Sequence, residues 1–405
     1  MRYASITDRL AGLGSDKWAV HLEGRRRAAA GDSLIFLSIG EPDLPPPAAV
    51  LEKAASAMHS GRTKYSAVRG EPAVLRAIAD HYTRRSGIVT HADEVVHMAG
   101  TQHALYSVLT ALVEQGDEVL VPDPYYATYE GVVASTGARF VPIRTRPEDR
   151  FHLTPAALEA VVTPKSRVLL LNSPSNPTGA VLSEAEIDAI GDVCERHDLW
   201  IVCDEVYATM TYDVAFASPF DRPLLRARSV SMASISKSHA LPGFRSGWVA
   251  CAPELARRLT LLSETMLFGT QPFLADATAV ALTRDHPEVA LLRSTFRDRA
   301  EALVAALEGC ANASASMPEG GMFVMIDIRP TGMSGEAFAR ALLDERGVVV
   351  MPGESFGAEG AGHIRVALTV DADVLADACQ RIASLADAHS AAAAGGSWLL
   401  TAVGE

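Results

Sequence analysis

Short apolar runs alternate with amphipathic stretches between residues 94 and 252, and this alternation is the main structural signal in the chain. Most of the runs are apolar throughout, which is typical of parallel strands buried on both faces of a sheet. The predicted strands are Glu118–Val121, Ala138–Pro142, Arg167–Leu171, Trp200–Cys203 and Ser229–Ala233. Because the stretches between them favour helices, the pattern predicts an α/β domain with a mostly parallel sheet.

Two of the intervening stretches, Thr101–Val113 and Ser183–Arg196, have the periodicity of helices. The second begins with Ser183 and has a glutamate three positions later, which is the pattern of a capping box. After residue 287 a long helical stretch is followed by apolar runs at residues 320–328, 347–350 and 363–369. This second pattern predicts a smaller α+β domain.

The chain has 405 residues, more than one hydrophobic core usually holds, so we expect one large and one smaller domain. The expected parts are an N-terminal segment (1–45) that packs with the small domain, a large domain (46–288), a small domain (289–390) and a flexible tail (391–405).

Composition excludes several classes of protein. The formal net charge of -13 opposes binding to a nucleic-acid backbone, and no uncharged apolar run of 18 residues predicts a membrane span. The five cysteines form no CxxC pair, and Met1–Arg9 lacks the layout of a signal peptide, so we expect a cytoplasmic protein. The 12 histidines show no HxxxH spacing, and we expect no metal site.

The segment Ser234-Ile235-Ser236-Lys237, with Arg245 eight positions further on, carries the strongest chemical signal. A lysine amine can form a Schiff base with a carbonyl cofactor, while hydroxyls and a guanidinium suit a phosphate. Upstream, the loop with Asn176 follows one predicted strand, and Asp204 and Tyr207 follow another. Ligands of open α/β sheets bind beyond the carboxyl ends of the strands, so we expect these residues to converge on one site.

In this order, the Asn176-Pro177-Thr178-Gly179 loop, the Asp204-x-x-Tyr207 strand end and the Ser-x-Ser-Lys237 loop resemble the class I/II aminotransferases of fold type I. These enzymes depend on pyridoxal 5′-phosphate (PLP). The resemblance covers nearly the whole chain. It implies a large domain with a mostly parallel seven-stranded sheet flanked by helices, a smaller α+β domain, and a homodimer with shared active sites.

The resemblance also implies a role for each residue of the motifs. Lys237 would carry the cofactor as a Schiff base and transfer the substrate proton once it is freed. Asp204 would pair with the pyridine nitrogen, Asn176 and Tyr207 would hydrogen-bond the phenolic oxygen, and Tyr126 would stack on the ring. The residues expected at the phosphate are Gly100, Thr101, Gln102, Ser234, Ser236 and Arg245, with Tyr65 reaching in from the other subunit.

For the substrate, the resemblance points to Arg365, because a guanidinium binds a carboxylate with two parallel hydrogen bonds. The backbone of Gly40 and the side chain of Asn176 would lie against the same carboxylate. Trp18 is a candidate wall of the side-chain pocket, although a tryptophan that only packs fits the sequence equally well.

The identity of the amino donor is predicted from weaker features of the sequence. Aspartate-type members place a lysine or an arginine against the side-chain carboxylate, and this chain has Gln102 at the position that aligns with one such lysine. Further segments, among them residues 321–332 and 362–365, resemble bacterial arginine:pyruvate aminotransferases. We therefore expect an arginine-like donor, with a 2-oxo acid such as pyruvate as acceptor.

Other reactions stay open on the sequence alone. An aspartate or aromatic aminotransferase, or an oxidase, hydroxylase or lyase on the same scaffold, would bind PLP with the same motifs. A PLP-sensing transcription regulator would need a DNA-binding extension, and only about 40 residues precede the Gly40 motif.

Overall fold

The computed structural model describes residues 1–389, so the tail expected at 391–405 lies outside the described residues. The chain divides into two compact units. Unit 1 consists of Met1–Gly14, Glu41–Arg297 and Glu319–Gly321, and unit 2 consists of Ser15–Gly40, Asp298–Pro318 and the residues from Met322 onward.

These limits differ from the boundaries expected at residues 45 and 288. The first 14 residues belong to unit 1 and not to the smaller unit, because their contacts lie there. The Arg9 Nε, for example, donates a hydrogen bond of 2.9 Å to the carbonyl oxygen of Ala134. Apolar periodicity could not reveal this, since helix α1 (Ser5–Arg9) has no buried residue.

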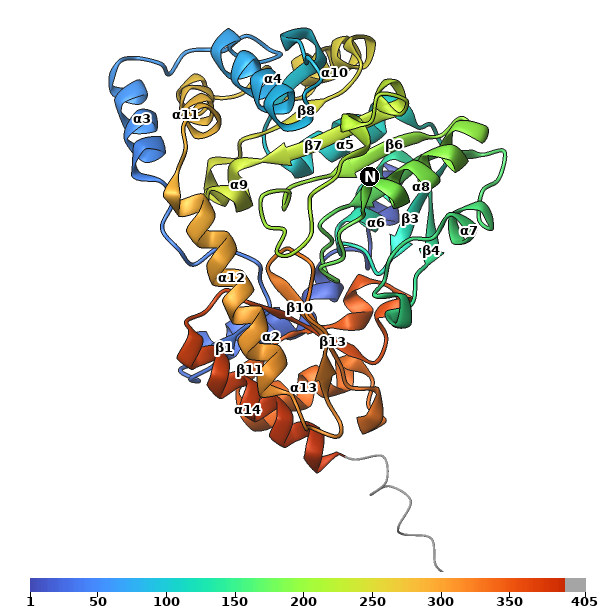
Figure 1. Ribbon diagram of the computed structural model, residues 1–405, viewed down its shortest axis with the longest axis vertical. Helices are drawn as coiled ribbons and strands as arrows, with labels where there is room; N and C mark the ends of the chain where they lie inside the picture. The colour runs from blue at the N-terminus through green and yellow to red at the C-terminus, as the bar shows by residue number, and fades with distance from the viewer. Residues whose placement is uncertain (390–405) are drawn as a thin grey trace, which may run out of the picture. The chain divides into compact units, whose positions relative to one another are not determined.

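Unit 1 is built on a seven-stranded sheet, which is drawn among its helices in Figure 1. The strands, in spatial order, are β2 (Val95–Met98), β8 (Gly247–Ala250), β7 (Ser229–Ser234), β6 (Trp200–Asp204), β5 (Ser166–Asn172), β3 (Glu118–Asp123) and β4 (Arg139–Arg144). Neighbours from β7 to β4 are parallel, and β8 is antiparallel to both β7 and β2. The predicted mostly parallel sheet is confirmed.

The apolar runs form strands because helices cover both faces of this sheet. Val202 packs in a core cluster with residues of α5 (Thr101–Leu112), α6 (Tyr129–Thr136) and α10 (Pro253–Met266). Its neighbours Ile201 and Cys203 point to the opposite face, into a cluster with α8 (Glu184–Arg196). The remaining helices of unit 1 are α3 (Ala48–His59), α4 (Pro72–Ser86), α7 (Pro155–Glu159), α9 (Ile235–Ser238) and α11 (Pro272–Thr283).

The predicted capping box at the start of α8 is present. The Ser183 Oγ accepts a hydrogen bond from the Glu186 N–H at 3.3 Å, and the Glu186 carboxylate accepts one from the Ser183 N–H at 2.8 Å. This pair satisfies amides that a helix leaves without internal partners, which is why the helix begins at this point.

Unit 2 has a small antiparallel sheet in the order β12 (Met351–Pro352), β13 (His363–Ala367), β10 (Phe323–Asp327) and β9 (Ser314–Ala315). A separate parallel pair joins β1 (Ile35–Phe36) to β11 (Val348–Val349). The helices of unit 2 are α2 (Ala19–Ala29), α13 (Gly335–Arg346) and α14 (Ala372–Ala388), while α12 (Pro287–Ala306) begins in unit 1 and ends in unit 2. The predicted α+β character of this part is confirmed.

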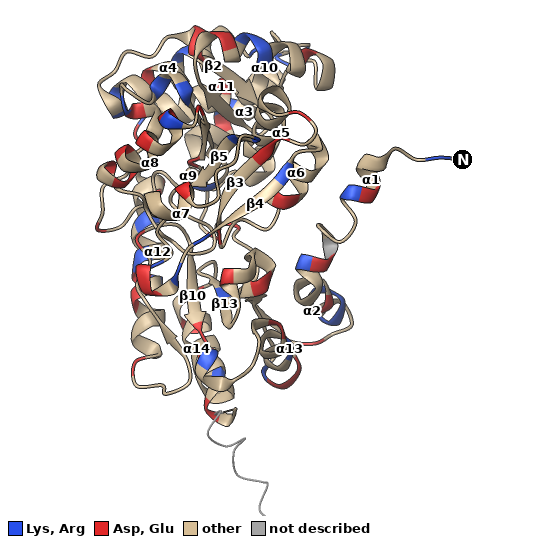
Figure 2. Ribbon diagram, turned by 90° about the vertical axis from the view of Figure 1, so that its right-hand side faces the viewer, with Lys and Arg blue, Asp and Glu red and all other residues tan. Residues whose placement is uncertain are grey.

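Three features concern the described chain as a whole. Acidic and basic residues are interspersed on helices such as α2, α4 and α10 (Figure 2). Within residues 1–389, no helix combines the length and apolar character needed to cross a membrane, and no three His, Cys, Asp or Glu side chains form a metal-binding group. All five cysteines are free thiols, and four of them are buried.

Candidate active site

The strand register of unit 1 aligns the carboxyl ends of β5 and β6 and places β7 beside β8. Asn172 pairs with Asp204, so the last residues of β5 and β6 are neighbours. Ser234, the last residue of β7, pairs with Gly247, and Gly247 also pairs with Met98 at the end of β2. The loops that follow these strands carry most of the predicted site residues, so the expectation that they share one sheet edge is confirmed for unit 1.

Asp204 is the buried acid of this edge, with 7% of its surface exposed. Its carboxylate accepts hydrogen bonds from the Tyr129 hydroxyl at 2.8 Å and from the Val206 N–H at 3.2 Å. Burial raises the pKa of Asp204 to about 6, an effect opposed by these two hydrogen bonds and by the positive charge of Lys237. The site therefore holds a buried carboxylate whose ionised form is stabilised by a nearby cation.

Asn176 and Tyr207 are both buried. Tyr207 follows Asp204 in the chain, and Asn176 lies in the loop after β5, the strand next to β6. The Asn176 N–H donates to the Asn172 Oδ1 at 2.7 Å, and the Asn172 Nδ2 donates to the Asp204 carbonyl oxygen at 2.9 Å. Asn172 thus connects the Asn176 loop to the end of β6. Tyr207 lies in the turn after β6, where its carbonyl oxygen accepts from the Met210 N–H at 2.8 Å.

The three tyrosines that follow β3, the last of which begins α6, have different environments. Tyr125 is buried and packs on Phe140 at a ring-centre distance of 4.6 Å. Tyr126 is half-buried, and its ring meets that of Tyr129 edge to face at 5.6 Å. Because Tyr129 also bonds Asp204, Tyr126 is connected to the buried acid through one side chain.

Lys237 lies on the short helix α9, directly after β7. Ser234 caps this helix, with its Oγ accepting from the Ser236 N–H at 3.3 Å. Both serines are buried and Lys237 is half-buried. The local sequence therefore places two hydroxyls and one amine within a single turn at the sheet edge.

Gly100, Thr101 and Arg245 form a cradle suited to an anion. Gly100 has a φ of +82° before α5, and a Cβ at this position would collide with the Arg245 guanidinium. The Thr101 Oγ1 is buried without a hydrogen-bond partner among the described residues, and the first amides of α5 favour negative charge. Gly247 adds to the close packing, since a Cβ there would lie 2.9 Å from the Gly100 Cα. Such donors and charge fit a phosphate group.

Two predicted phosphate residues lie further out. Gln102 is exposed on α5, and its Oε1 accepts from the Thr128 hydroxyl at 3.1 Å. Tyr65 is 87% exposed and stacks edge to face on Phe268 at 5.2 Å. Its expected role at the phosphate of another subunit stays a prediction.

The predicted substrate residues Arg365, Gly40 and Trp18 all belong to unit 2. Arg365 is 1% exposed, and its guanidinium lies 4.2 Å from the ring centre of Phe323 and 4.6 Å from that of Phe356. It also donates to the carbonyl oxygen of Ser38. A Cβ at Gly40 would lie 2.7 Å from Phe323 Cε1, so glycine permits this packing.

Trp18 ends a short 3₁₀ helix before α2 and is half-buried. Its expected role in the side-chain pocket stays a prediction.

Tyr129 and Asn172 are site residues that the sequence reasoning missed. Both bond Asp204, one at its side chain and one at its backbone. A signal existed for Asn172, which begins the loop that carries Asn176. The signal for Tyr129 was weaker. Tyr129 lies three positions after Tyr126, a spacing that places two side chains together only within a helix, and α6 begins at Tyr129 itself.

Comparison with known proteins identifies the family. The sequence model of aminotransferase class I and II matches residues 32–382. The chain is 42% identical over 383 residues to arginine–pyruvate transaminase AruH of Pseudomonas aeruginosa, covering 95% of this chain and 98% of that protein. It is also 34% identical to the aspartate/prephenate aminotransferase of Cereibacter sphaeroides, covering 94% and 98% of the two chains.

Solved structures agree. The aspartate aminotransferase of Thermus thermophilus with maleate superposes with a TM-score of 0.90 at 29% identity, covering 95% of this chain and 100% of that one. The aspartate aminotransferase of Rhizobium meliloti gives the same TM-score and identity, covering 96% and 99% of the two chains. The chain therefore belongs to the class I and II aminotransferases, PLP-dependent enzymes of fold type I.

Proposed function

We propose that this aminotransferase moves the amino group of an L-amino acid, with arginine or a similar basic donor preferred, to a 2-oxo acid such as pyruvate. The observation that supports an arginine-like donor is the 42% identity to arginine–pyruvate transaminase AruH over 95% of the chain. Alternate binding of donor and acceptor at one site gives ping-pong kinetics.

PLP is the proposed cofactor. When bound, it stabilises the negative charge that remains on the substrate Cα after the α-proton leaves. The anion cradle of Gly100, Thr101 and Arg245 supports binding of its phosphate, together with the buried hydroxyls of Ser234 and Ser236. The buried carboxylate of Asp204 supports pairing with a protonated pyridine nitrogen, because burial disfavours the ionised form and a cation beside it stabilises that form.

The remaining residues have proposed roles in holding and moving groups. Lys237 attaches the cofactor and then carries the α-proton of the substrate, because it is the one lysine on the loop after β7. Asn176 and Tyr207 hydrogen-bond the phenolic oxygen, and Tyr126 covers one face of the ring. Gln102 and Tyr65 complete the proposed phosphate contacts, Tyr65 from a second subunit.

For substrate binding we propose that Arg365 holds the α-carboxylate. Its support is the buried guanidinium between Phe323 and Phe356, which would accept a carboxylate with little cost in side-chain entropy. The Gly40 backbone and the Asn176 amide are proposed neighbours of the same carboxylate, and Trp18 a wall of the side-chain pocket.

We also propose a homodimer in a reducing cytoplasm. The exposed rings of Tyr65 and Phe268, 87% and 53% exposed, form an apolar patch of the kind that subunit contacts cover. Four buried free thiols suit a reducing compartment.

The test is a titration of the purified protein with PLP, followed by arginine, aspartate and alanine in turn, and then by pyruvate. We expect a near-visible cofactor band that arginine abolishes at the lowest concentration and that pyruvate restores, with one alanine formed per arginine consumed. A kcat/KM for aspartate equal to that for arginine would overturn the donor. Consumption of oxygen without an acceptor would replace transamination by oxidation, and the lack of any band would overturn PLP binding.

A further inference from the structure

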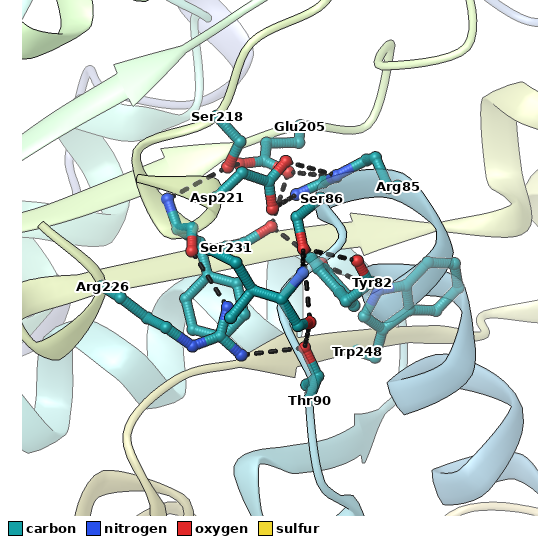
Figure 3. A network of polar contacts seen from close by, with 12 residues as sticks. Tyr82, Arg85, Ser86, Thr90, Glu205, Ser218, Asp221, Arg226, Ser231 and Trp248 are labelled. Carbon is teal, nitrogen blue, oxygen red and sulfur yellow. Dashed lines mark hydrogen bonds and ion pairs between the residues drawn. The ribbon is translucent and has the colours of Figure 1, made fainter. Parts of the chain in front are cut away.

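Two acidic residues, Asp204 and Glu205, stand next to each other at the end of β6. Adjacent residues of an extended strand point to opposite faces of the sheet, so the two carboxylates have separate surroundings. Asp204 meets Tyr129 on the face covered by α6. Glu205 meets Arg85 of α4 on the other face, where Figure 3 shows it as part of a polar network.

Three hydrogen-bond donors surround the Glu205 carboxylate. The Arg85 Nη1 lies 2.9 Å away, the Ser231 hydroxyl lies 2.6 Å away, and the Ser218 hydroxyl contacts the other oxygen. The Glu205 side chain is 0% exposed, so these donors replace water. Three donors around one buried carboxyl group match an ionised glutamate, which only accepts.

The donors around Glu205 are themselves held in place. Arg85 binds Asp221 with two parallel hydrogen bonds of 2.7 and 2.8 Å. Since the Ser231 hydrogen goes to Glu205, Tyr82 donates to Ser231 at 2.7 Å and Trp248 donates to Tyr82 at 3.2 Å. The network thus ties α4, β7 and β8 to the end of β6 (Figure 3).

The backbone of Glu205 connects this network to the candidate site. Its N–H donates to the Met232 carbonyl at 2.8 Å, and its carbonyl accepts from the Ala208 N–H at 2.9 Å. These bonds fix the residues on both sides, which are Asp204 and the turn with Tyr207. A shift of the Glu205 side chain would therefore move the backbone that carries both.

We propose that Arg85 is a positioning residue for Asp204: by holding Glu205 ionised and fixed on the far face of the sheet, its guanidinium holds the end of β6 in the geometry that binds the cofactor. This inference rests on the proposed function of the same site. Arg85 bonds Glu205, which is adjacent to Asp204 in the chain, so it acts through another residue and not on the cofactor.

The charges around Glu205 determine what loss of Arg85 does. On the face of Glu205, Asp221 and the Tyr82 hydroxyl are its titratable neighbours, Asp204 acts on it electrostatically from the opposite face, and Arg85 is the cation bonded to it. Burial already raises the pKa of Glu205, and Arg85 opposes that effect while Asp221 adds to it. Without the guanidinium, the pKa of Glu205 rises further, and a charge formed on the carboxylate at higher pH has no cation beside it and disturbs the strand end.

The experiment measures the dissociation constant for PLP by absorbance titration at pH 6.5 and 8.5, in wild type and four variants. For Arg85→Met we expect weaker binding by about tenfold at pH 8.5 and a smaller loss at pH 6.5. Arg85→Met combined with Glu205→Gln removes the unpaired charge and should restore binding to within about threefold at both pH values. Arg85→Lys should lie between wild type and Arg85→Met.

Arg84→Met is the matched control, because Arg84 is on the same helix and donates to the Leu282 carbonyl at 2.7 Å, away from Glu205. It should leave PLP binding unchanged. If Arg85→Met lowers the thermal midpoint but keeps wild-type affinity at both pH values, the role is only structural and the proposal is overturned; if Arg85→Met does not fold, a wild-type affinity in Arg85→Lys and no rescue by the double variant overturn it. A wild type that binds no PLP would instead refute the proposed function.

Discussion

Gly100 combines a conformation that favours glycine with a position where any Cβ would displace the Arg245 guanidinium. Its φ is +82°, and a Cβ would collide with the Arg245 guanidinium. Gly116 has a similar φ of +92°, but a Cβ there would meet no described atom within 4 Å. A comparison of variants at these two glycines therefore distinguishes the effect of backbone strain from the effect of a clash in the anion cradle.

We predict that Gly100→Ala and Gly116→Ala each lower the free energy of unfolding by about 1–3 kcal/mol, because both force alanine to a positive φ. Only Gly100→Ala should also weaken binding of PLP and of inorganic phosphate, since Arg245 must move away. Urea unfolding and isothermal titration measure the two effects. Equal phosphate affinity in the two variants would contradict a role of this cradle in anion binding.

Lys237 and Lys165 form a second matched pair. Lys165 is exposed before β5, while Lys237 is half-buried after β7. Because a positioned general base contributes roughly 10²–10⁴ to a rate, we predict that Lys237→Ala lowers kcat by at least that factor, and that Lys165→Ala leaves it unchanged. Steady-state transamination with arginine and pyruvate provides the measurement. Substantial turnover by Lys237→Ala would remove this lysine from the chemistry.

At the same scale, the sequence predicted residues at strand ends better than their partners. Lys237, Asp204 and Asn176 were predicted because their motifs resemble those of a known family and because parallel strands bring their carboxyl ends to one edge. Tyr129 and Arg85 were not, because their contacts depend on how α6 and α4 cross the sheet, and no local pattern encodes that approach. Sequence reasoning thus identified groups that can do chemistry and missed the groups that hold them.

Among the elements, the segment Glu319–Gly321 is a short piece of chain that belongs to unit 1 although its neighbours on both sides belong to unit 2. The N–H groups of Glu319 and Gly320 both donate to the Gly179 carbonyl at 3.0 Å, in the loop that carries Asn176. The Glu319 carboxylate accepts from the Val181 N–H at 2.8 Å and meets His152 at 2.9 Å. The segment therefore buttresses the Asn176 loop.

The stability that this segment gives to the Asn176 loop should depend on pH, because His152 bonds Glu319. Its hydrogen bond with Glu319 raises the pKa of His152 against the effect of burial, and Glu186 at 2.6 Å adds to the increase. A raised pKa in the folded state means that the stabilisation is fully present below the unfolded pKa of about 6.5 and is lost as pH rises through the folded value.

We therefore predict that His152→Gln lowers the free energy of unfolding by about 1–2 kcal/mol more at pH 5.5 than at pH 8.5. The exposed His59 on α3 serves as control, and His59→Gln should show no such difference. Urea titrations at the two pH values give both comparisons. An equal loss at both values would show that His152 contributes by packing and not by charge.

The helices and strands themselves were largely predictable, because burial imposes a periodicity on the sequence. Predicted Trp200–Cys203 and Ser229–Ala233 became β6 and β7, each one residue longer. The division of the chain was less accessible. Residues 1–14 and Glu319–Gly321 join unit 1 through backbone and charged contacts that leave no apolar pattern.

For the whole molecule, the exposed position of Tyr65 leads to the last prediction. Its ring is 87% exposed beside Phe268, so it is accessible to a second subunit. If Tyr65 serves the phosphate of a second subunit, then Lys237 and Tyr65 of one active site come from different chains. A closed twofold dimer has two such sites, each built from both subunits.

We predict that the Tyr65→Ala and Lys237→Ala variants, each nearly inactive alone, regain activity when they are unfolded together and refolded as a mixture. Half of the dimers would be mixed, and each would hold one site with both native residues, so activity should approach about a quarter of wild type. Lys165→Ala refolded with Tyr65→Ala is the control for the refolding yield, since its chains bring intact Tyr65 and Lys237 together. If the mixture of the two inactive variants shows no gain while this control does, Tyr65 and Lys237 act within one chain and the shared site is refuted. Light scattering of the same samples would show whether the protein is still a dimer. A dimer that shows no complementation would refute the shared active site but not the dimer.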